Sequence, residues 1–435
     1  MSDYAIIGAG PSGLAMAREL QKLGLSADGF EAADSVGGLW DISNPRSTMY
    51  ESAHLISSRT TTEFTEFPMR TRVDYPGHRA LKEYFDDYAD AFGLRGMFQF
   101  QSRVTSVEKH ERGGWLVTVE TPTGTVSKTY RGVILANGTL AEPKVPEFFG
   151  TFDGEIMHTS AYKQPSQLTG KRVLIIGAGN SGCDIAVDAV HHAESVDLSV
   201  RRGYYFVPRY LFGKPSDTLN QGRPLPRRLK QFVDTRVLRA FTGDPVRFGF
   251  PKPNYKIYES HPIVNTLVLQ HLGQGDLRIV PDIAEFDGSS VVFRGGEREE
   301  YDLVLLATGY HLDYPMVDRA HLNWQKAAPE LFLNIFTPSF NGLYVMGMVE
   351  ASGLGWQGRA EQAALIAAYL HAASSEPDRA ERFRIRVAEQ SWPDLTAGYR
   401  FLGLERMSYY VNKDAYRSAV RAETAALRKR IEVKR

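Results

Sequence analysis

The stretch DYAIIGAGPSGLAMARELQKLGL, residues 3–25, decides the fold. A short apolar run leads into a turn that contains Gly8, Gly10 and Gly13, and apolar residues then recur at helical spacing up to Gly24. Strand, glycine turn and helix in this order are typical of a dinucleotide-binding unit, because the glycines permit the tight turn, the approach of a pyrophosphate and the packing of helix on strand. We predict that a dinucleotide pyrophosphate binds at Gly8, Gly10, Pro11, Ser12 and Gly13.

A carboxylate follows where such a unit requires one. Glu31 stands about 20 residues beyond the turn, at the expected end of the second strand, where it would accept hydrogen bonds from ribose hydroxyls.

The same pattern returns in KRVLIIGAGNSGCDIAVDAVHHAESVDLSVRRG, residues 171–203. Its second strand ends in two arginines instead of an acid, and guanidinium groups suit the 2′-phosphate that distinguishes NADP from NAD. One glycine turn alone is weak evidence, whereas two copies in the same context are specific. We predict that NADPH is bound by Gly177, Gly179, Asn180, Ser181, Gly182, Arg201 and Arg202.

The chain also repeats at a coarser level. Short alternating segments with turn residues follow each glycine turn, at 115–130 and 289–302, and each set leads into an apolar strand, at 132–138 and 303–309. Unrelated hairpins would explain one copy but are a strained explanation of two. We therefore predict an α/β protein with two Rossmann-like dinucleotide-binding domains, each carrying a β-meander insertion.

Residues 341–370 return to the first domain, because they are predicted to form a strand, a glycine-rich turn and a helix. We predict that the first domain is discontinuous, with parts 1–163 and 306–435 flanking a second domain at 164–305. Residues 203–262 are rich in proline and aromatic residues, which indicates an ordered, loop-rich cover.

Charge and cysteine content exclude several classes of protein. The 51 basic and 51 acidic residues balance, which disfavours nucleic acid as a partner. A single cysteine, Cys183, excludes an intrachain disulfide and a two-cysteine redox centre, and it is interpreted as a packing residue. No apolar run reaches the roughly 18–20 residues of a membrane span. We expect a cytoplasmic protein without a membrane partner, and a homodimer stays open.

Metal ligands are not indicated. His191 and His192 are adjacent on a predicted helix and point in different directions, so we expect no metal site.

The stretch FDGEIMHTSAY, residues 152–162, carries a more specific signal. Its Phe152, Gly154, His158 and Tyr162 resemble the fingerprint of the class B flavin-dependent monooxygenases, and Tyr162 is similar to the N- and S-oxygenating branch, the flavin-containing monooxygenases. From the residues alone, Phe152 would pack at a domain junction, Gly154 would allow a positive φ, and His158 and Tyr162 would share a face if the segment were helical. A purely structural role for His158, bonding an interdomain loop, stays an alternative.

Other segments extend the resemblance over nearly the whole chain. GGLW at 37–40 is similar to the family's flavin-contacting turn, GKPSD at 213–217 and FGFPKP at 248–253 to its NADPH-side insertion, and ATGY at 307–310 to its late signature. The charged end at 421–435 resembles soluble bacterial members. The resemblance implies further cofactor contacts at Gly38, Leu39, Trp40, His54, His158, Tyr162, Thr308, Gly309, Trp356 and Gln357.

The resemblance implies a reaction as well. FAD would take hydride from NADPH and react with O2, and the resulting C4a-hydroperoxyflavin would oxygenate a soft nitrogen or sulfur atom of a small-molecule substrate. Baeyer–Villiger oxygenation of a ketone is an alternative. A disulfide reductase would need a second cysteine, and a sensor without turnover would consume no NADPH.

One departure from the family concerns YESAHLISSRTTTEFTEFP, residues 50–68. Where the family carries an Asn beside the flavin, this chain has Ile56, which cannot donate a hydrogen bond. The neighbouring side chains that would replace it are His54, Ser57 and Ser58, so we treat all four as candidate catalytic residues. The departure also implies an alternative, an uncoupled NADPH oxidase.

Overall fold

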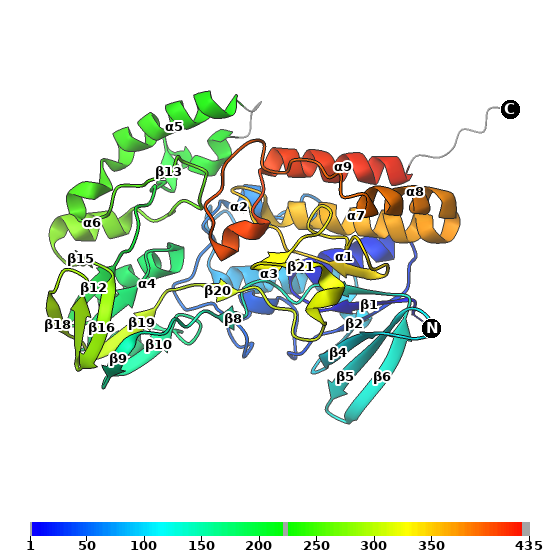
Figure 1. Cartoon of the computed structure of the whole chain (residues 1–435), viewed down its shortest axis with the longest axis horizontal. Coiled ribbons are helices and arrows are strands. Elements are labelled where there is room, and N and C mark those ends of the chain that lie inside the picture. The colour runs from blue at the N-terminus through cyan, green and yellow to red at the C-terminus, as the bar shows by residue number, and fades with distance from the viewer. Residues whose placement is uncertain (1, 221–224, 429–435) are drawn as a thin grey trace.

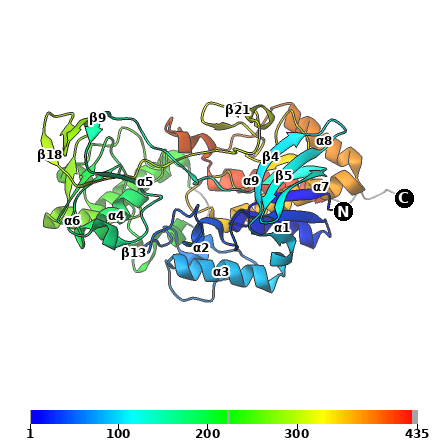
Figure 2. The same cartoon turned by 90° about the horizontal axis from the view of Figure 1, so that it is seen from below.

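The computed structural model describes residues 2–220 and 225–428. Two α/β modules lie side by side along the long axis of the molecule (Figures 1 and 2). The first module contains strand β1 and the first glycine turn, and the second contains strand β11 and the second glycine turn.

The first module is built on five parallel strands in the order β23-β7-β1-β2-β3. Strands β1, β7 and β23 are fully buried, as expected for a parallel sheet covered on both faces. The bounds are β1 Tyr4–Ile7, β2 Ala27–Phe30, β3 Phe98–Gln99, β7 Gly132–Leu135 and β23 Leu343–Val345.

The second module repeats this plan, with parallel strands in the order β10-β19-β11-β12-β15. In each sheet the strand before the glycine turn lies in the centre, so the predicted α/β fold with two Rossmann-like units is confirmed. The bounds are β10 Glu155–His158, β11 Arg172–Ile176, β12 Ser195–Ser199, β15 Arg278–Val280 and β19 Leu303–Leu306.

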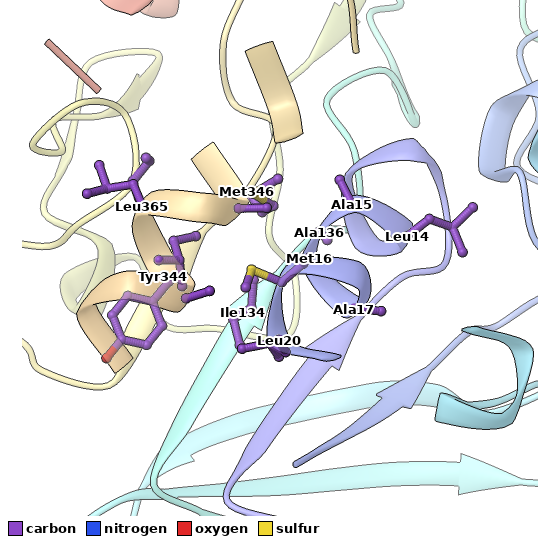
Figure 3. Close-up of a cluster of buried hydrophobic side chains, with 14 of the residues drawn as sticks. Leu14, Ala15, Met16, Ala17, Leu20, Ile134, Ala136, Tyr344, Met346 and Leu365 are labelled. Carbon is purple, nitrogen blue, oxygen red and sulfur yellow. The ribbon is translucent and has the colours of Figure 1, made fainter. Parts of the chain in front are cut away.

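Helices cover both sheets. Helix α7 contacts α1, α8 and α9, which explains why small and apolar side chains occur on most of its sides. Figure 3 shows side chains of α1, β7, β23 and α7 in one buried cluster that includes Met16, Ile134, Met346 and Leu365. The bounds are α1 Pro11–Lys22, α3 His78–Ala91, α4 Asn180–Val190, α6 Leu267–Gln274, α7 Gly355–Ser375, α8 Pro377–Ala388 and α9 Lys413–Arg428.

Both predicted meanders are present. The first is antiparallel, with strands β4 Arg103–Lys109, β5 Trp115–Thr121 and β6 Gly124–Tyr130. The second has strands β16 Ile283–Gly288, β17 Ser290–Phe293 and β18 Arg298–Glu300, and β9 Phe149–Phe152 joins its edge in parallel with β16.

Residues 149–158 correct the predicted boundary at 163. Strand β9 pairs with β16 and strand β10 with β19, so both belong to sheets of the second module. The partners lie more than a hundred residues further along the chain, and nothing local in the two four-residue strands announces them.

The predicted loop-rich cover contains a helix, α5 Arg227–Thr242, of 16 residues. Only Gln231 and Leu238 of α5 are buried, so the apolar periodicity that indicates a helix is weak. The rest of the cover comprises the hairpin β13 Tyr210–Leu211 and β14 Lys214–Pro215, with the 3-10 helices η4 Ser216–Asn220 and η5 Pro245–Phe248.

The two chain crossings between the modules run side by side. Strands β8 Glu142–Pro143 and β20 Tyr310–His311 pair antiparallel in the middle of the molecule (Figure 1). The remaining elements are η1 Gly38–Trp40, α2 Arg59–Thr62, η2 Leu94–Met97, η3 Pro165–Leu168, η6 Arg319–Leu322, β21 Trp324–Gln325, β22 Ala328–Pro329 and η7 Glu405–Tyr409. Within the described ranges, no helix has the length and apolar character needed to cross a bilayer.

Candidate cofactor and substrate site

The first glycine turn is closed by backbone contacts that exclude side chains. Gly8 has φ +103°, and a Cβ on it would lie 2.7 Å from the carbonyl oxygen of Ala136. A Cβ on Gly13 would lie 1.8 Å from the carbonyl oxygen of Gly8, so helix α1 can approach β1 only with glycine there. No side chain caps the start of α1. Its free N–H groups can therefore donate hydrogen bonds to an anion.

The second turn has the same geometry. Gly177 has φ +105°, and its Cβ would lie 2.6 Å from the carbonyl oxygen of Ala307, while a Cβ on Gly182 would lie 2.0 Å from that of Gly177. A Cβ on Gly179 would meet no heavy atom within 4 Å, so the space in front of α4 is open. The side chain of Asn180 accepts a hydrogen bond from Val264 N–H at 2.8 Å.

Two distant segments converge on the first turn. A Cβ on Gly38, in η1, would lie 3.0 Å from Gly10 Cα, and a Cβ on Gly347 would lie 2.4 Å from the Ser12 hydroxyl oxygen. The GGLW turn and the return segment therefore both border the start of α1. A small space, the cradle, remains between Gly10 and Gly38. A Cβ on Gly10 would enter it and would lie 3.6 Å from Gly38 Cα.

Glu31 lies at the end of β2, beside this turn. Its Oε2 accepts the Ala9 N–H at 2.6 Å and its Oε1 accepts the Ala33 N–H at 2.9 Å. These bonds fix a buried carboxylate, and each oxygen keeps capacity for a further donor.

Arg201 and Arg202 follow β12, as the sequence predicts. Arg201 is exposed, and Arg202 lies over the ring of Tyr204 at 5.2 Å. Neither arginine forms an ion pair with another residue in the described part of the chain. Two positive charges therefore lie just beyond the end of β12, beside the second turn.

The fingerprint histidine joins the end of β10 to the second chain crossing, just before β20. His158 ends β10, and its Nε2 lies 3.0 Å from the Gly309 carbonyl oxygen, while its Nδ1 accepts the Ser160 N–H at 3.1 Å. Burial lowers the pKa of His158, so the imidazole is neutral and Nε2 carries the hydrogen. The alternative role, in which His158 bonds an interdomain loop, matches this geometry.

The fingerprint tyrosine is buried and points into the same junction. The Tyr162 hydroxyl donates to Asp188 at 2.9 Å, and Ser52 donates to the same carboxylate oxygen. Because β10 ends at His158 and a turn follows, His158 and Tyr162 do not share a helical face.

Two further expectations for the fingerprint are wrong. Gly154 does not have a positive φ; it is glycine because a Cβ would lie 2.6 Å from the Phe152 ring and 2.8 Å from the Asp302 carbonyl oxygen. Phe152 packs on Phe286, 5.4 Å between ring centroids, within the second module and not at the domain junction.

The four candidate catalytic residues differ in their burial and in their hydrogen-bond partners. His54 is exposed, with Nδ1 2.5 Å from the Ser52 carbonyl oxygen. Ile56 and Ser57 are half-buried, and Ser58 is buried with its N–H and hydroxyl both donating to Asp217. Ser57 forms no hydrogen bond with any residue that the structure describes, so its hydroxyl is the free donor beside Ile56.

The start of α7 is tied to protein groups. Trp356 is buried against Tyr84 and Phe85 and meets Trp40 edge to face at 6.0 Å. Gln357 accepts the N–H of Thr65 at 2.9 Å.

The late ATGY segment is tied to the first chain crossing. The Thr308 hydroxyl donates to the Lys144 carbonyl oxygen at 2.5 Å, and Gly309 has φ +86°.

Sequence reasoning missed a cluster between the modules. The Nδ1 atom of His261 lies 3.3 Å from the Tyr410 hydroxyl. His261 precedes Pro262, whose carbonyl oxygen accepts a hydrogen bond from the Asn180 side chain at 3.2 Å. Tyr410 also bonds Ser352 at 3.0 Å. Burial lowers the pKa of His261 to about 4, so the imidazole is neutral. The three segments are remote in sequence, and no motif announces their meeting.

A cavity of about 370 Å³ lies beside the GGLW turn, lined by Trp40, Ile42, His78, Lys82 and Lys163 among others. A larger hollow of about 860 Å³ lies at the opposite end of the second sheet from its glycine turn. Its arginines, such as Arg278 with Asp197, pair with neighbouring acids, so the smaller cavity is the one relevant to the turns.

Comparison with known proteins decides the family. The family described as flavin-binding monooxygenase-like matches residues 2–383. This chain belongs to that family. It is similar to flavin-containing monooxygenase 5 of Oryctolagus cuniculus, 32% identical over 373 residues that span 80% of this chain and 69% of that protein. It is also similar to flavin-containing monooxygenase 3 of the same organism, 32% identical over 374 residues that span 80% of this chain and 70% of that protein.

Solved structures show the same fold. An open structure of cyclohexanone monooxygenase matches with a TM-score of 0.72 at 20% identity, over 98% of this chain and 96% of that one. S-allyl-L-cysteine S-oxygenase from Allium sativum matches with a TM-score of 0.68 at 20% identity, over 97% and 88%. As a family member, this flavin-binding monooxygenase is an enzyme that uses FAD and NADPH.

Proposed function

We propose that this monooxygenase transfers one oxygen atom of O2 to a soft nitrogen or sulfur atom of a small molecule. The balance is substrate, NADPH, H⁺ and O2 giving the N- or S-oxide, NADP⁺ and water. The observation that carries the choice of acceptor is the fingerprint residue Tyr162, where Baeyer–Villiger relatives tend to have Trp. Its buried hydroxyl donates a hydrogen bond to Asp188.

FAD fits the first turn. The cradle between Gly10 and Gly38 is space that a Cβ would fill, beside uncapped N–H groups of α1, and this suits a pyrophosphate. Glu31, fixed by two backbone N–H groups, would accept the ribose hydroxyls. Leu39 and Trp40 would then lie along the flavin, on the side that faces the start of α7.

NADPH fits the second turn. Gly179 leaves open space before the uncapped start of α4. Arg201 and Arg202, which form no ion pair with any residue that the structure describes, would supply positive charge for a 2′-phosphate. His158 and Tyr162 would act indirectly, because they hold the junction that sets the distance between the two turns.

The bound cofactors supply hydride transfer, reaction with O2 and delivery of one oxygen atom. The chain's own part is to orient them and to exclude water. Ile56 would form an apolar wall beside the reacting edge. Ser57, the free hydroxyl next to it, would donate the hydrogen bond that the family Asn supplies.

The test is a substrate screen in air with the purified yellow enzyme, offering a tertiary amine, a thioether and a cyclic ketone at equal concentration. We expect NADPH oxidation to rise with the amine or the thioether, and the product to gain one oxygen atom by mass. A lactone from the ketone would instead support Baeyer–Villiger chemistry, and no NADPH consumption would support a sensor.

Ile56 favours a second candidate, an NADPH oxidase. If no replacement donor acts, O2 would leave as hydrogen peroxide with one NADPH consumed for each peroxide. Peroxide that equals the NADPH consumed, with every substrate present, would establish this function.

A further inference from the structure

The cover of the second module grips the segment that carries Ile56. Asp217 lies in η4, directly after β14, and η4 packs against α2. One oxygen of its carboxylate, Oδ2, accepts the Ser58 N–H at 2.7 Å and the Ser58 hydroxyl at 3.0 Å, and it also accepts the Thr61 hydroxyl. Three donors of the first module thus meet one oxygen of the second.

These hydrogen bonds stabilise the negative charge of Asp217. No basic side chain forms an ion pair with Asp217 in the described ranges, and its other oxygen, Oδ1, is buried without a partner. Hydrogen bonds to an ionised group are about twice as strong as neutral ones. Among the residues that the structure describes, this partly buried carboxylate is held by Ser58 and Thr61, and it holds them in return.

A second set of contacts joins the same two segments away from Ile56. The Tyr75 hydroxyl donates to the Arg209 carbonyl oxygen at 2.5 Å, and the Tyr210 hydroxyl donates to Asp74 at 3.0 Å. The 3-10 helix η4, which contacts both β14 and α2, links the hairpin to this part of the first module. The contacts that dock the cover on the first module can therefore be mutated separately from the hydrogen bonds between Asp217 and Ser58.

We propose that Asp217 is a positioning residue. It fixes residues 56–58, which we call the Ile56–Ser58 corner, and ties them to the second module. With the corner held, Ile56 and the free Ser57 hydroxyl keep one position, and oxygen goes to the substrate. With the corner released, more of the NADPH is spent on the side reaction of NADPH, H⁺ and O2 to NADP⁺ and hydrogen peroxide. The effect on peroxide rests on the proposed function, whereas the grip itself does not.

The first experiment measures the grip without cofactors or turnover. Amide hydrogen exchange is compared for the wild type, Asp217→Asn and the matched control Tyr210→Phe, all in the FAD-free form. Because the Ser58 N–H donates to Asp217, we expect its exchange to become at least about tenfold faster in Asp217→Asn and to stay unchanged in Tyr210→Phe. Unchanged Ser58 exchange in Asp217→Asn would overturn the proposal.

The second experiment measures coupling in the FAD-loaded enzymes. We expect Asp217→Asn to raise peroxide per NADPH at least about twofold, because a weakened charge-assisted bond loosens the corner, and to leave the NADPH KM within about twofold. Thr61→Val, which keeps Asp217 and removes one donor, should shift the ratio in the same direction by less. Faster exchange with unchanged peroxide in both variants would overturn the functional part.

Failure of the proposed function has a different signature. A wild-type enzyme that oxygenates neither amine nor thioether refutes that function, while Ser58 exchange still decides whether Asp217 holds the corner. If Asp217→Asn does not fold, Thr61→Val carries both measurements, with the same directions required.

Discussion

The hydroxyl of Tyr162 donates a 2.9 Å hydrogen bond to the carboxylate of Asp188, on helix α4. The same carboxylate oxygen accepts a hydrogen bond from the Ser52 hydroxyl. One acidic residue of the second module therefore holds both Tyr162 and the segment before Ile56. The aromatic ring of Tyr162 packs on Tyr50 at 5.6 Å. Tyr162 of the fingerprint is therefore a brace between the modules.

Tyr162→Phe should weaken this brace without opening a cavity. A hydrogen bond to a charged group contributes about 1.5–3 kcal/mol, and Ser52 still satisfies Asp188, so we expect the free energy of unfolding to fall by about 1–2 kcal/mol. Urea denaturation of the FAD-free protein measures it. Tyr50→Phe is the control, because its contact with Asp184 is longer, 3.3 Å. An equal loss in both variants would contradict the assignment.

Patterns confined to a few tens of residues could be predicted from the sequence. Both glycine turns, the meanders and the return of residues 341–370 rest on local periodicity, and the structure has them. The bonds that brace the site could not be predicted, because they join distant residues. His158 and Gly309 are 151 residues apart, and Ser58 and Asp217 are 159 apart. Hydrogen bonds of this kind need only one donor and one acceptor, and many residues of the chain carry one or the other.

The glycines of the first turn should separate folding from FAD binding. Gly10 has φ −72° and ψ −175°, which alanine adopts freely, so Gly10→Ala should fold. Its methyl group would enter the cradle beside Gly38, and we expect the FAD affinity to fall at least about tenfold. Gly13→Ala should lose folding itself, because its Cβ would lie 1.8 Å from the Gly8 carbonyl oxygen.

Flavin fluorescence titration and thermal unfolding of the FAD-free variants test this pair. Gly179→Ala is the matched control in the second turn, where nothing lies within 4 Å of the added Cβ, and it should keep FAD and weaken only NADPH. Full FAD retention by Gly10→Ala would count against the predicted pyrophosphate position.

Arg201 and Arg202 should select NADPH over NADH. Charge-assisted contacts to a 2′-phosphate are worth about 1.5–3 kcal/mol each, so Arg201→Ala or Arg202→Ala should raise the NADPH KM roughly tenfold or more. The NADH KM should change little. Arg236→Ala, an exposed arginine of α5, is the control. Equal losses with both nucleotides would show that neither arginine reads the phosphate.

Acid should destabilise the enzyme through His261. Burial first, and then the nearby Arg406, lower the pKa of His261 to about 4, so in acid the unfolded chain takes up a proton that the folded protein refuses. Stability is therefore lost as the pH falls from about 6.5 toward 4. Burial lowers the pKa of His158 in the same sense, whereas burial raises the pKa of Asp184, which works in the opposite direction.

His261→Gln isolates this contribution. Between pH 7 and pH 5, the unfolding free energy of the wild type should fall by at most about 2 kcal/mol more than that of the variant. Parallel pH curves for the two proteins would rule out the lowered pKa.

Ile56 should decide how much oxygen escapes as peroxide. An isoleucine cannot donate a hydrogen bond, and the neighbouring Ser58 bonds to Asp217. The Ser57 hydroxyl, which forms no hydrogen bond with any residue that the structure describes, is therefore the replacement for the family Asn that we test first. A lost hydrogen bond to a polarised group is worth about 1.5–3 kcal/mol, or a tenfold or larger change in rate. Without substrate, Ile56→Asn should therefore release less hydrogen peroxide per minute than the wild type, and Ser57→Ala should release more. Peroxide counted against NADPH consumed in air is the measurement, and Ile56→Leu, which keeps an apolar wall, should match the wild type. An unchanged or faster leak in Ile56→Asn would mean that the apolar wall itself protects the oxygen, and that the isoleucine is an adaptation rather than a loss.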